Sequence, residues 1–227
     1  MTIKALIISS EITKGMKSLG SRSMLNINKT NKIIDQQISS IRSMYRNTQI
    51  TIAAGFEYEK VKQYINHRYK NIELIHNQDY ASSNEVGNIK LFLDSSVEDM
   101  DYLFVMNGGV LLKNKSISFN KIKGSSKIFL MRSIKNNFSL GCSKKDTIEY
   151  IFYDLEIPWC ECVLLNRKSI DNLRDFLNDN SIKNMYTFEL LNHIFHKDSM
   201  EPIYINKNHI MKITNSSELI KAKNFLT

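Results

Sequence analysis

The chain has 227 residues, of which 42% are hydrophobic and 24% charged, and its formal net charge is +8. This length suits one sizeable domain of ordinary globular composition, and no apolar run approaches the roughly 20 residues that a membrane span needs. The N-terminal sequence lacks the pattern of a signal peptide, so we expect a protein that is not secreted and has no membrane contact.

Strands and helices are expected to alternate along the first half of the chain. Apolar runs predict strands over 3–9, 49–55, 71–77 and 101–107, and helical periodicity predicts helices over 30–46, 57–69 and 84–97. Thr30 and Asn84 are the expected N-terminal caps of two of these helices. The alternation predicts an α/β fold with a parallel sheet, helices on both faces, and a ligand site beyond the carboxyl ends of the strands.

The second half of the chain is less regular. It contains predicted strands over 126–133, 147–154 and 202–206 and predicted helices over 168–179, 185–197 and 216–226. The first two strands are candidates for an antiparallel direction, and Ser216 is the expected cap of the last helix. Without a linker or an internal repeat, one compact domain is the economical interpretation.

The positive charge favours acidic partners such as nucleotides, nucleic acid or an acidic protein surface. The denser basic groups, 113–123 and 142–145, contain one aromatic residue, Phe119, and lack the interleaved aromatic residues of a single-strand binder. We therefore favour a solvated basic face over nucleic-acid binding. The cysteines Cys142, Cys160 and Cys162 are too few for a disulfide framework and lack the spacing of a zinc site, so buried free thiols are expected.

Four segments, in the right order, resemble the sugar-phosphate nucleotidyltransferase family. They are 54–65 (a Gly-Tyr-x-x-Glu helix start), 77–92 (an Asn-x-x-Tyr … Asn segment), 104–112 (an Asn-Gly-Asp turn) and 211–226 (the closing segment). The resemblance implies a single nucleotidyltransferase-like domain over 1–227, of GT-A or Rossmann-like type with a mainly parallel sheet. Residues 1–112 would form a nucleotide-binding-like half and residues 113–227 a sugar-site-like half.

The chemistry implied by the resemblance is attack of a sugar phosphate on the α-phosphate of a nucleoside triphosphate. It needs a phosphate-binding loop, a cation, and carboxylates that hold Mg²⁺. Gly109 and Thr214 stand where the two metal-binding acids are expected, and Glu11 stands in the loop, where a carboxylate would repel a triphosphate. The nearby acids Asp79, Glu85 and Asp101 belong to other elements and are not expected to replace them. We expect no intact catalytic or metal site and no cofactor.

Some candidate contacts to a nucleotide or substrate remain. Arg22 keeps the charge of the expected loop lysine, Asn84 and Asn107 fall in matching segments, and Glu189 falls near the implied sugar site.

Four side chains, Glu189, His193, His196 and Trp159, have a structural and a functional interpretation. Glu189, His193 and His196 could share one helix face as metal ligands, but a polar face above an apolar one is favoured. Trp159 could lie at the edge of the site, but a place in the core is favoured.

These observations favour a catalytically degenerate nucleotidyltransferase-like protein that acts as a binding or assembly scaffold. The wealth of Lys, Asn and Ile indicates an AT-rich bacterial or phage genome, which suits a virion or accessory component, located in the cytoplasm or the virion. A protein partner or homo-oligomer, or residual nucleotide or sugar-phosphate binding, is expected. The alternative is an active Mg²⁺-dependent nucleotidyltransferase that joins a nucleoside triphosphate to a sugar phosphate or similar head group.

Overall fold

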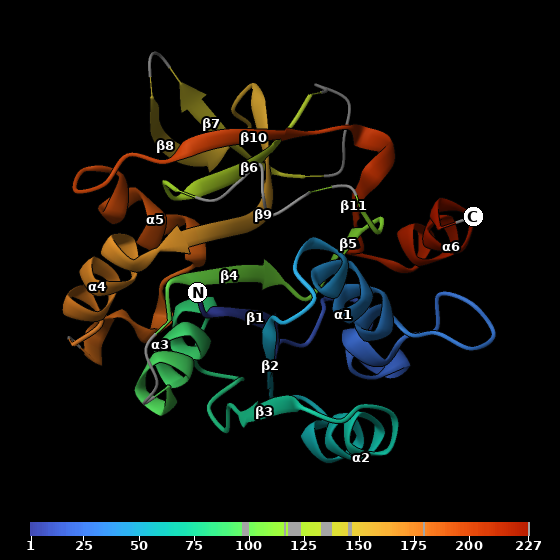
Figure 1. The fold of residues 1–227 in the computed structure, drawn as a ribbon. Helices are drawn as coiled ribbons and strands as arrows, with labels where there is room; N and C mark the ends of the chain where they lie inside the picture. The colour runs from blue at the N-terminus through green and yellow to red at the C-terminus, as the bar shows by residue number, and fades with distance from the viewer. Residues whose placement is uncertain are drawn as a thin grey trace.

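A mixed sheet with the strand order β10–β6–β9–β4–β1–β2–β3 forms the centre of the fold, with β7 and β8 attached at β9 (Figure 1). The computed structural model describes residues 1–96, 100–115, 117, 124–132, 138–144, 147–178 and 180–226. Positions 97, 133 and 179 of the predicted elements lie outside these ranges, as do residues 116, 118–123 and 145 of the basic groups.

The strands of this sheet are short, buried runs. They are β1 (Ile3–Ser9), β2 (Gln49–Ala54), β3 (Ile72–His76), β4 (Tyr102–Asn107), β6 (Lys127–Met131), β7 (Leu140–Lys144), β8 (Ile148–Tyr153), β9 (Ile157–Asn166) and β10 (Glu201–Ile205). A two-stranded antiparallel ribbon joins β5 (Val110–Leu112) to β11 (Ile210–Lys212). All seven residues of β1 are buried, as expected for a central strand that is covered on both faces.

The pairing is mainly parallel, which confirms the predicted fold class. Strands β1, β2, β3 and β4 pair in parallel, and so do β6 and β10. Strand β9 is antiparallel to both of its neighbours in the order, β4 and β6. Strand β6 therefore runs in the same direction as β4. The strand predicted over 126–133, which is β6, is thus antiparallel to its neighbour β9 but not to the parallel strands of the sheet.

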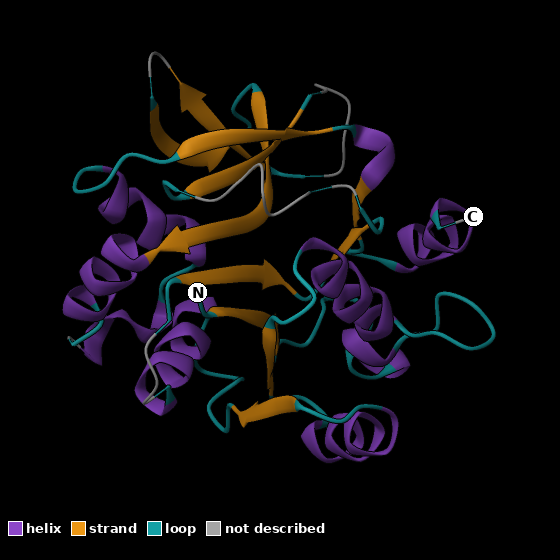
Figure 2. Ribbon diagram, in the orientation of Figure 1, coloured by secondary structure: helices purple, strands orange, loops and turns teal. Residues whose placement is uncertain are grey.

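Helices cover both faces of the sheet, as Figure 2 shows in purple. They are α1 (Ile33–Met44), α2 (Tyr58–Arg68), α3 (Glu85–Ser95), α4 (Arg167–Phe176), α5 (Thr187–Phe195) and α6 (Ser216–Phe225), with short 3-10 turns at Lys17–Leu19, Arg22–Met24, Asn180–Asn184 and Lys207–His209. Helices α3, α4 and α5 pack on one face through residues such as Phe92, Ile170 and Leu191. Helices α1 and α2 pack on the other through Ile38 and Val61.

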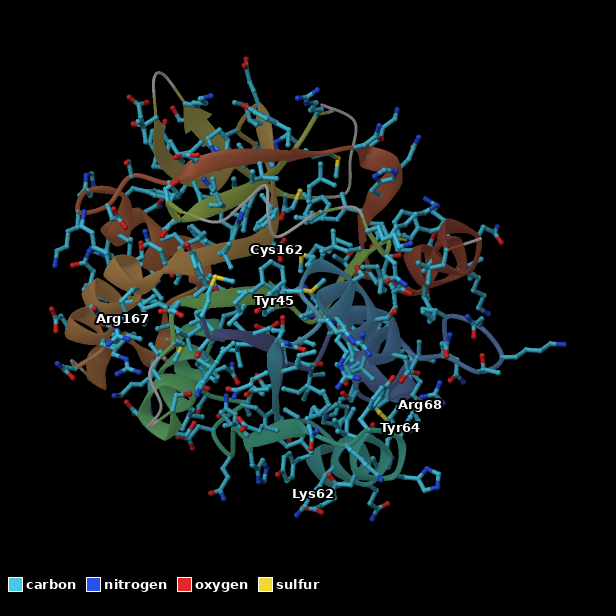
Figure 3. All side chains as sticks on the ribbon, in the orientation of Figure 1. Tyr45, Lys62, Tyr64, Arg68, Cys162 and Arg167 are labelled. Carbon is cyan, nitrogen blue, oxygen red and sulfur yellow. The ribbon has the colours of Figure 1, made fainter. Side chains whose placement is uncertain are left out.

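A buried carboxylate fixes α1 against α2. Asp35 accepts hydrogen bonds of 2.6 Å from the hydroxyl groups of Tyr64 and Tyr69, and Arg68 Nε lies 3.2 Å from its Oδ1. Figure 3 shows Tyr64 and Arg68 side by side at this junction. Because charge-assisted hydrogen bonds are the strong ones, this network holds α1 rigidly beside the site.

Strand β9 is not predicted by the sequence pattern, and two helix caps differ from the predicted ones. Strand β9 contains Pro158, which cannot donate a ladder hydrogen bond, and Glu161, whose φ is 51°. Thr30 lies two residues before Lys32, the residue at the cap position of α1, and its hydroxyl donates to Asn28 Oδ1 instead. Asn215, not Ser216, caps α6, because its Oδ1 accepts from Glu218 N at 3.0 Å.

Two smaller predictions, the free buried cysteines and the core position of Trp159, are confirmed. The three cysteines are free and buried, and Trp159 is a core residue that is 2% exposed. His193 stacks on Phe176, with the ring centroids 4.6 Å apart. Among the described helices, none is long and apolar enough to cross a membrane.

Candidate functional site at the strand ends

The carboxyl ends of β1 and β4 form the place where a parallel sheet of this kind binds ligands. Asn107, the last residue of β4, connects three elements there and is 7% exposed. Its Oδ1 accepts from Gly109 N at 2.8 Å and from Arg22 Nη2 at 3.2 Å, and its Nδ2 donates to Glu85 Oε1 at 2.7 Å. Since Asn107 uses both polar atoms of its side chain on the protein, it fixes the turn more than it offers a free contact.

Helix α1 holds the same turn through hydrogen bonds from one of its side chains. Gln37, which is fully buried, donates from Nε2 to the Val110 carbonyl at 2.9 Å and to the Asn107 carbonyl at 3.4 Å. The turn over residues 107–110 is thus held on two sides, so its shape is set before any ligand binds.

The two positions expected to carry metal-binding acids do lie together. Ile213 N donates to the Gly109 carbonyl at 2.8 Å, which places Thr214 directly after the residue that contacts the turn. Thr214, however, is committed to the start of α6, since its N and Oγ1 donate to Glu218 Oε2 at 2.6 and 2.7 Å. Neither Gly109 nor Thr214 offers a carboxylate, which is what Mg²⁺ sites require.

The space beside Gly109 is occupied by a guanidinium. A Cβ built on Gly109 would lie 2.8 Å from Arg22 Nη1 and 2.9 Å from both Arg22 Cζ and the Ile213 carbonyl oxygen. Real Cβ atoms do not make contacts this short, so an acid at this position cannot coexist with Arg22 as it is placed. The sequence places a cation in the loop, and the fold brings that cation beside Gly109, the position where the family resemblance implies an acid.

Glu161 and Lys212 form a buried charge pair at the same edge. Glu161 on β9 is 6% exposed, and its Oε1 accepts from Lys212 Nζ on β11. Burial raises the pKa of Glu161, and Lys212 opposes that effect. A buried pair of this kind costs desolvation free energy, and removal of one partner leaves an uncompensated charge.

Glu11 is a further charged residue at the strand ends, beside Arg22, Glu85, Glu161 and Lys212. It follows β1 by two residues, and burial raises its pKa to about 7, with further raising by Glu85 and opposition from Arg22. Three carboxylates (Glu11, Glu85 and Glu161) therefore face two cations across the strand ends. No group of three or more His, Cys, Asp or Glu side chains in the described ranges is arranged to hold a metal ion.

The interior of this site is nearly full. A cavity of about 10 Å³ lies between Glu85, Asn107, Trp159, Glu161 and Thr187. This volume is that of roughly one water molecule. A nucleotide cannot lie between these side chains without displacing them.

The predicted contact residues fall in different places. Arg22 and Asn107 meet in the site, as described above. Asn84 is the residue before α3, and its Nδ2 donates to the Asn184 carbonyl, which ties α3 to the segment before α5. Glu189 accepts from Tyr186 N at 2.7 Å and so caps α5.

Three residues of the site, Glu85, Glu161 and Lys212, are not among the residues that the sequence predicts there. Glu85 contacts Asn107 directly, although it was not expected to take part, while Asp101 lies at the other end of β4. Glu161 and Lys212 were not singled out. The only sequence signal for Glu161 is a single charge inside an apolar run, and Lys212 has none, because only the tertiary fold brings β9 and β11 together.

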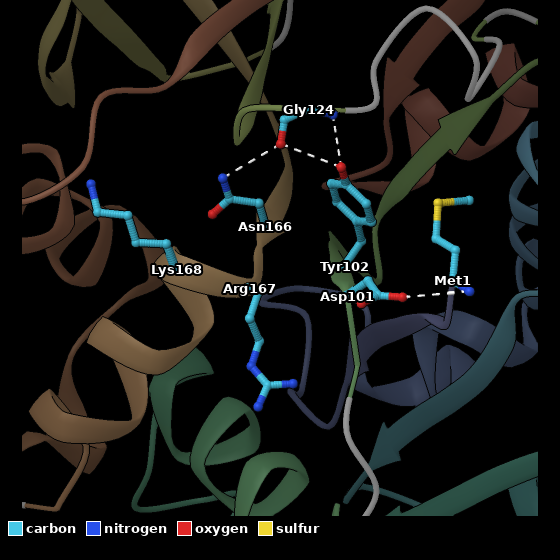
Figure 4. A pocket seen from close by; sticks show the side chains of 7 residues that line it. All are labelled: Met1, Asp101, Tyr102, Gly124, Asn166, Arg167 and Lys168. Atoms are coloured by element: carbon cyan, nitrogen blue, oxygen red, sulfur yellow. Dashed lines mark hydrogen bonds and ion pairs between the residues drawn. The ribbon is translucent and has the colours of Figure 1, made fainter.

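Two larger hollows lie elsewhere. One, of about 500 Å³, is lined by residues including Asp101, Asn166 and Lys168, at the amino end of the parallel strands and away from the charge group (Figure 4). The other, of about 390 Å³, lies beside β3 and α3 and is lined by residues including Asp79 and Lys90. The second adjoins the loop after β3, which belongs to the segment that resembles the nucleotidyltransferases.

Solved structures similar to this chain are nucleotide-transferring enzymes. The CTP:phosphocholine cytidylyltransferase from Streptococcus pneumoniae matches over 100% of both chains, with a TM-score of 0.82 and 14% identity. A nucleoside-diphosphate-sugar pyrophosphorylase from Vibrio cholerae matches over 97% of this chain and 99% of its own, with a TM-score of 0.78 and 10% identity. The inositol-1-phosphate CTP transferase from T. maritima matches over 99% and 96%, with a TM-score of 0.75 and 11% identity.

Sequence-level comparison adds no further relatives. No protein-family model and no curated protein matches this sequence. The agreement over the whole chain in three dimensions, at identities of 10 to 14%, establishes the fold and not the activity. The chain has the fold of the nucleotidyltransferase family that its sequence segments resemble.

Proposed function

We propose that this chain uses the nucleotidyltransferase fold for binding or assembly and does not transfer nucleotides. The observation that carries the proposal is the guanidinium of Arg22 beside Gly109. A cation there would repel Mg²⁺ at the position where the family resemblance requires a carboxylate, and the positions of Gly109 and Thr214 supply no negative charge to offset it.

The charge pair of Glu161 and Lys212 supports the same proposal. Lys212 neutralises Glu161, the carboxylate that lies deepest in the site. Recruitment of Glu161 to a metal would leave Lys212 without its carboxylate in a region where unpaired charges are costly. In this proposal the charges stabilise the fold and present a fixed surface.

Residual binding of phosphate is a variant of this proposal. Arg22 is 7% exposed, and its Nε is a buried donor without a hydrogen-bond partner among the described residues. A phosphate group of a nucleotide or sugar phosphate is a suitable acceptor for it. Binding of such a ligand without turnover would be compatible with the charges at the site.

A second candidate function is active, Mg²⁺-dependent nucleotide transfer. Two carboxylates, Glu85 and Glu161, flank the same small cavity, and the similar structures carry names of transferring enzymes. This function would require the ion pair between Lys212 and Glu161 to break, so that the Glu161 carboxylate could bind the metal.

Pyrophosphate release separates the two candidates. Purified protein is incubated with Mg²⁺, each of the four nucleoside triphosphates, and phosphocholine, inositol-1-phosphate or glucose-1-phosphate. We expect no release above background. Release that is abolished in Asn107→Ala would establish transfer at this site, because Asn107 organises the turn and a contaminating enzyme would be insensitive to the change.

In its assembly role the chain would be a virion or accessory component. The wealth of Lys, Asn and Ile, which indicates an AT-rich bacterial or phage genome, supports this part of the proposal. Light scattering on the purified chain would detect a homo-oligomer. Mass spectrometry of purified virions from an infected host would detect incorporation, and an absence of both would argue against a structural role.

A further inference from the structure

A basic face runs along helix α1. Residues 12–56 contain seven lysines and arginines but one acid, Asp35, and residues 102–145 contain no acid. The fold places α1 between α2 and the ribbon of β5 and β11, so cations that are scattered in the sequence meet there (Figure 1). The basic face consists of eight exposed or half-buried cations, namely Lys29, Lys32, Arg42, Arg46, Arg68, Lys70, Lys113 and Lys115.

The loop before α1 and the end of α2 share one group of these cations. Lys32 Nζ and Arg68 Cζ lie 5.2 and 5.9 Å from the centroid of the same ring, that of Tyr64. Arg68 Nη2 also donates to Asn31 Oδ1 at 2.9 Å, which holds the loop that contains Lys29 beside α2. Two segments that are far apart in the sequence thus present their charges together.

The other end of α1 continues the basic face. Arg42 Cζ lies 5.8 Å from the ring centroid of Tyr69, the residue before Lys70. On the opposite side of α1, Lys115 N donates to Ser43 Oγ at 3.0 Å. The cations therefore flank α1 on both sides, and from residue 32 to residue 46 the strip is roughly 20 Å long, at about 1.5 Å per residue.

The single acid of residues 12–56 offsets one of the eight cations. Asp35 is 5% exposed, and Arg68 Nε lies 3.2 Å from its Oδ1. The exposed or half-buried side chains along α1 between the cations are neutral, as at Gln36, Ser39 and Ser43. Charges within about 10 Å act together at 0.1 M salt, so the basic face attracts an extended anion as a unit.

We propose that the basic face binds the phosphate backbone of double-stranded nucleic acid. The inference rests on the proposed binding function and names the class of its partner. A duplex carries one negative charge per about 1.7 Å of its axis, which is a regular line of charge on the scale of this strip. Lys, Arg, Ser and Gln side chains are among the groups that contact phosphates in such complexes, without reading the base sequence.

The sequence alone favours a solvated face, because its denser basic groups lack interleaved aromatic residues. Only two of the eight cations, Lys113 and Lys115, belong to those groups. The remaining six come from segments with no dense basic run, and only the packing of α1 against α2 brings them together.

Two other anionic partners fit the basic face less well. An anionic membrane is bound by apolar side chains together with cations. In the described part of the chain, no large hydrophobic side chain between residues 20 and 90 is exposed. Single-stranded nucleic acid is bound by stacking of bases on aromatic rings. The rings of Tyr64 and Tyr69 instead lie under the protein's own cations, and their hydroxyl groups donate to Asp35.

Fluorescence anisotropy with a labelled DNA duplex tests the proposal, without nucleotide or Mg²⁺. For duplexes of about 20 base pairs we expect saturable binding, equal for two unrelated sequences, with a slope of log affinity against log salt of about −4. This slope corresponds to about four or five neutralised phosphates. No binding at about 50 mM salt, or tighter binding to phosphatidylserine vesicles or to polyglutamate, would overturn the proposal. The pyrophosphate assay remains the separate test of the proposed function, because duplex binding and nucleotide transfer are measured independently.

Charge reversals locate the binding. The double variant Arg46→Glu, Lys70→Glu should weaken duplex binding about tenfold or more and reduce the salt slope by about 2. The matched control is Lys183→Glu, Lys197→Glu, which changes the net charge equally at exposed positions before and after α5. Equal weakening in the two double variants, at unchanged melting temperatures, would show a response to net charge alone and would overturn the proposal. If the reversal lowers the melting temperature, Arg46→Gln with Lys70→Gln gives the same comparison against Gln at 183 and 197.

Discussion

The placement of Arg22 beside Gly109 makes Gly109→Ala the most informative single substitution. The added methyl group would lie 2.8 Å from Arg22 Nη1 and 2.9 Å from the Ile213 carbonyl oxygen. Arg22 is 7% exposed and cannot simply swing into solvent, and Ile213 contributes backbone that is tied to Gly109. Overpacking of this kind costs about 1–3 kcal/mol, which for a domain of this size lowers the melting temperature by roughly 2–4 °C per kcal/mol.

Urea unfolding of four proteins measures this coupling: wild type, Gly109→Ala, Arg22→Met and the double variant. In the Arg22→Met background the cost of Gly109→Ala should fall by about 0.5 kcal/mol or more, since two of the three short contacts involve the guanidinium. The contact with Ile213 remains and prevents full relief. A cost below about 0.5 kcal/mol in the wild type, or an unchanged cost in the Arg22→Met background, would refute the packing argument.

Three further predictions concern the charges around the site. Lys212→Met leaves Glu161 buried without its partner and should lower the free energy of unfolding, measured in urea, by about 3–5 kcal/mol. The double variant with Met at both 161 and 212 should lower it much less, because no charge is left unpaired. Glu11 has a pKa of about 7 in the fold against 4.5 ordinarily, so the folded state holds its proton more tightly. The free energy of unfolding should therefore fall as pH rises from about 4.5 to 7, by at most about 3 kcal/mol, and Glu11→Gln should remove that fall. Glu57 Oε2 accepts from Ser21 N at 2.8 Å, so Glu57→Ala should speed tryptic cleavage in the 11–20 loop, and an unchanged cleavage rate would contradict this anchoring.

The elements that could be predicted are those with a local signal. The central strands β1 and β4 are continuous apolar runs, and the helices that cover them have apolar residues at helical spacing, so type and order follow from sequence alone. Strand β9 was missed because Pro158 and Glu161 interrupt its apolar run. The cap positions moved by one or two residues, because several Asn, Ser and Thr residues compete to cap the same helix end.

The site was predictable in part. Gly109 and Thr214 were expected at one edge of the sheet, and the hydrogen bond from Ile213 N to the Gly109 carbonyl brings their segments together there. The charged side chains that lie around these two positions were not predictable. The approach of Arg22 to Gly109 and the pairing of Glu161 with Lys212 join positions 51 to 87 residues apart, and no local pattern marks such contacts.

Binding of Mn²⁺, measured by electron paramagnetic resonance with saturating nucleoside triphosphate, tests the central claim most directly. If Arg22 and Lys212 have replaced the metal, the spectrum with protein should equal that of Mn²⁺ and nucleotide alone. A protein-bound Mn²⁺ signal at one equivalent, lost in Glu161→Gln, would show that the strand ends still hold a metal and would contradict the proposal of a non-catalytic protein.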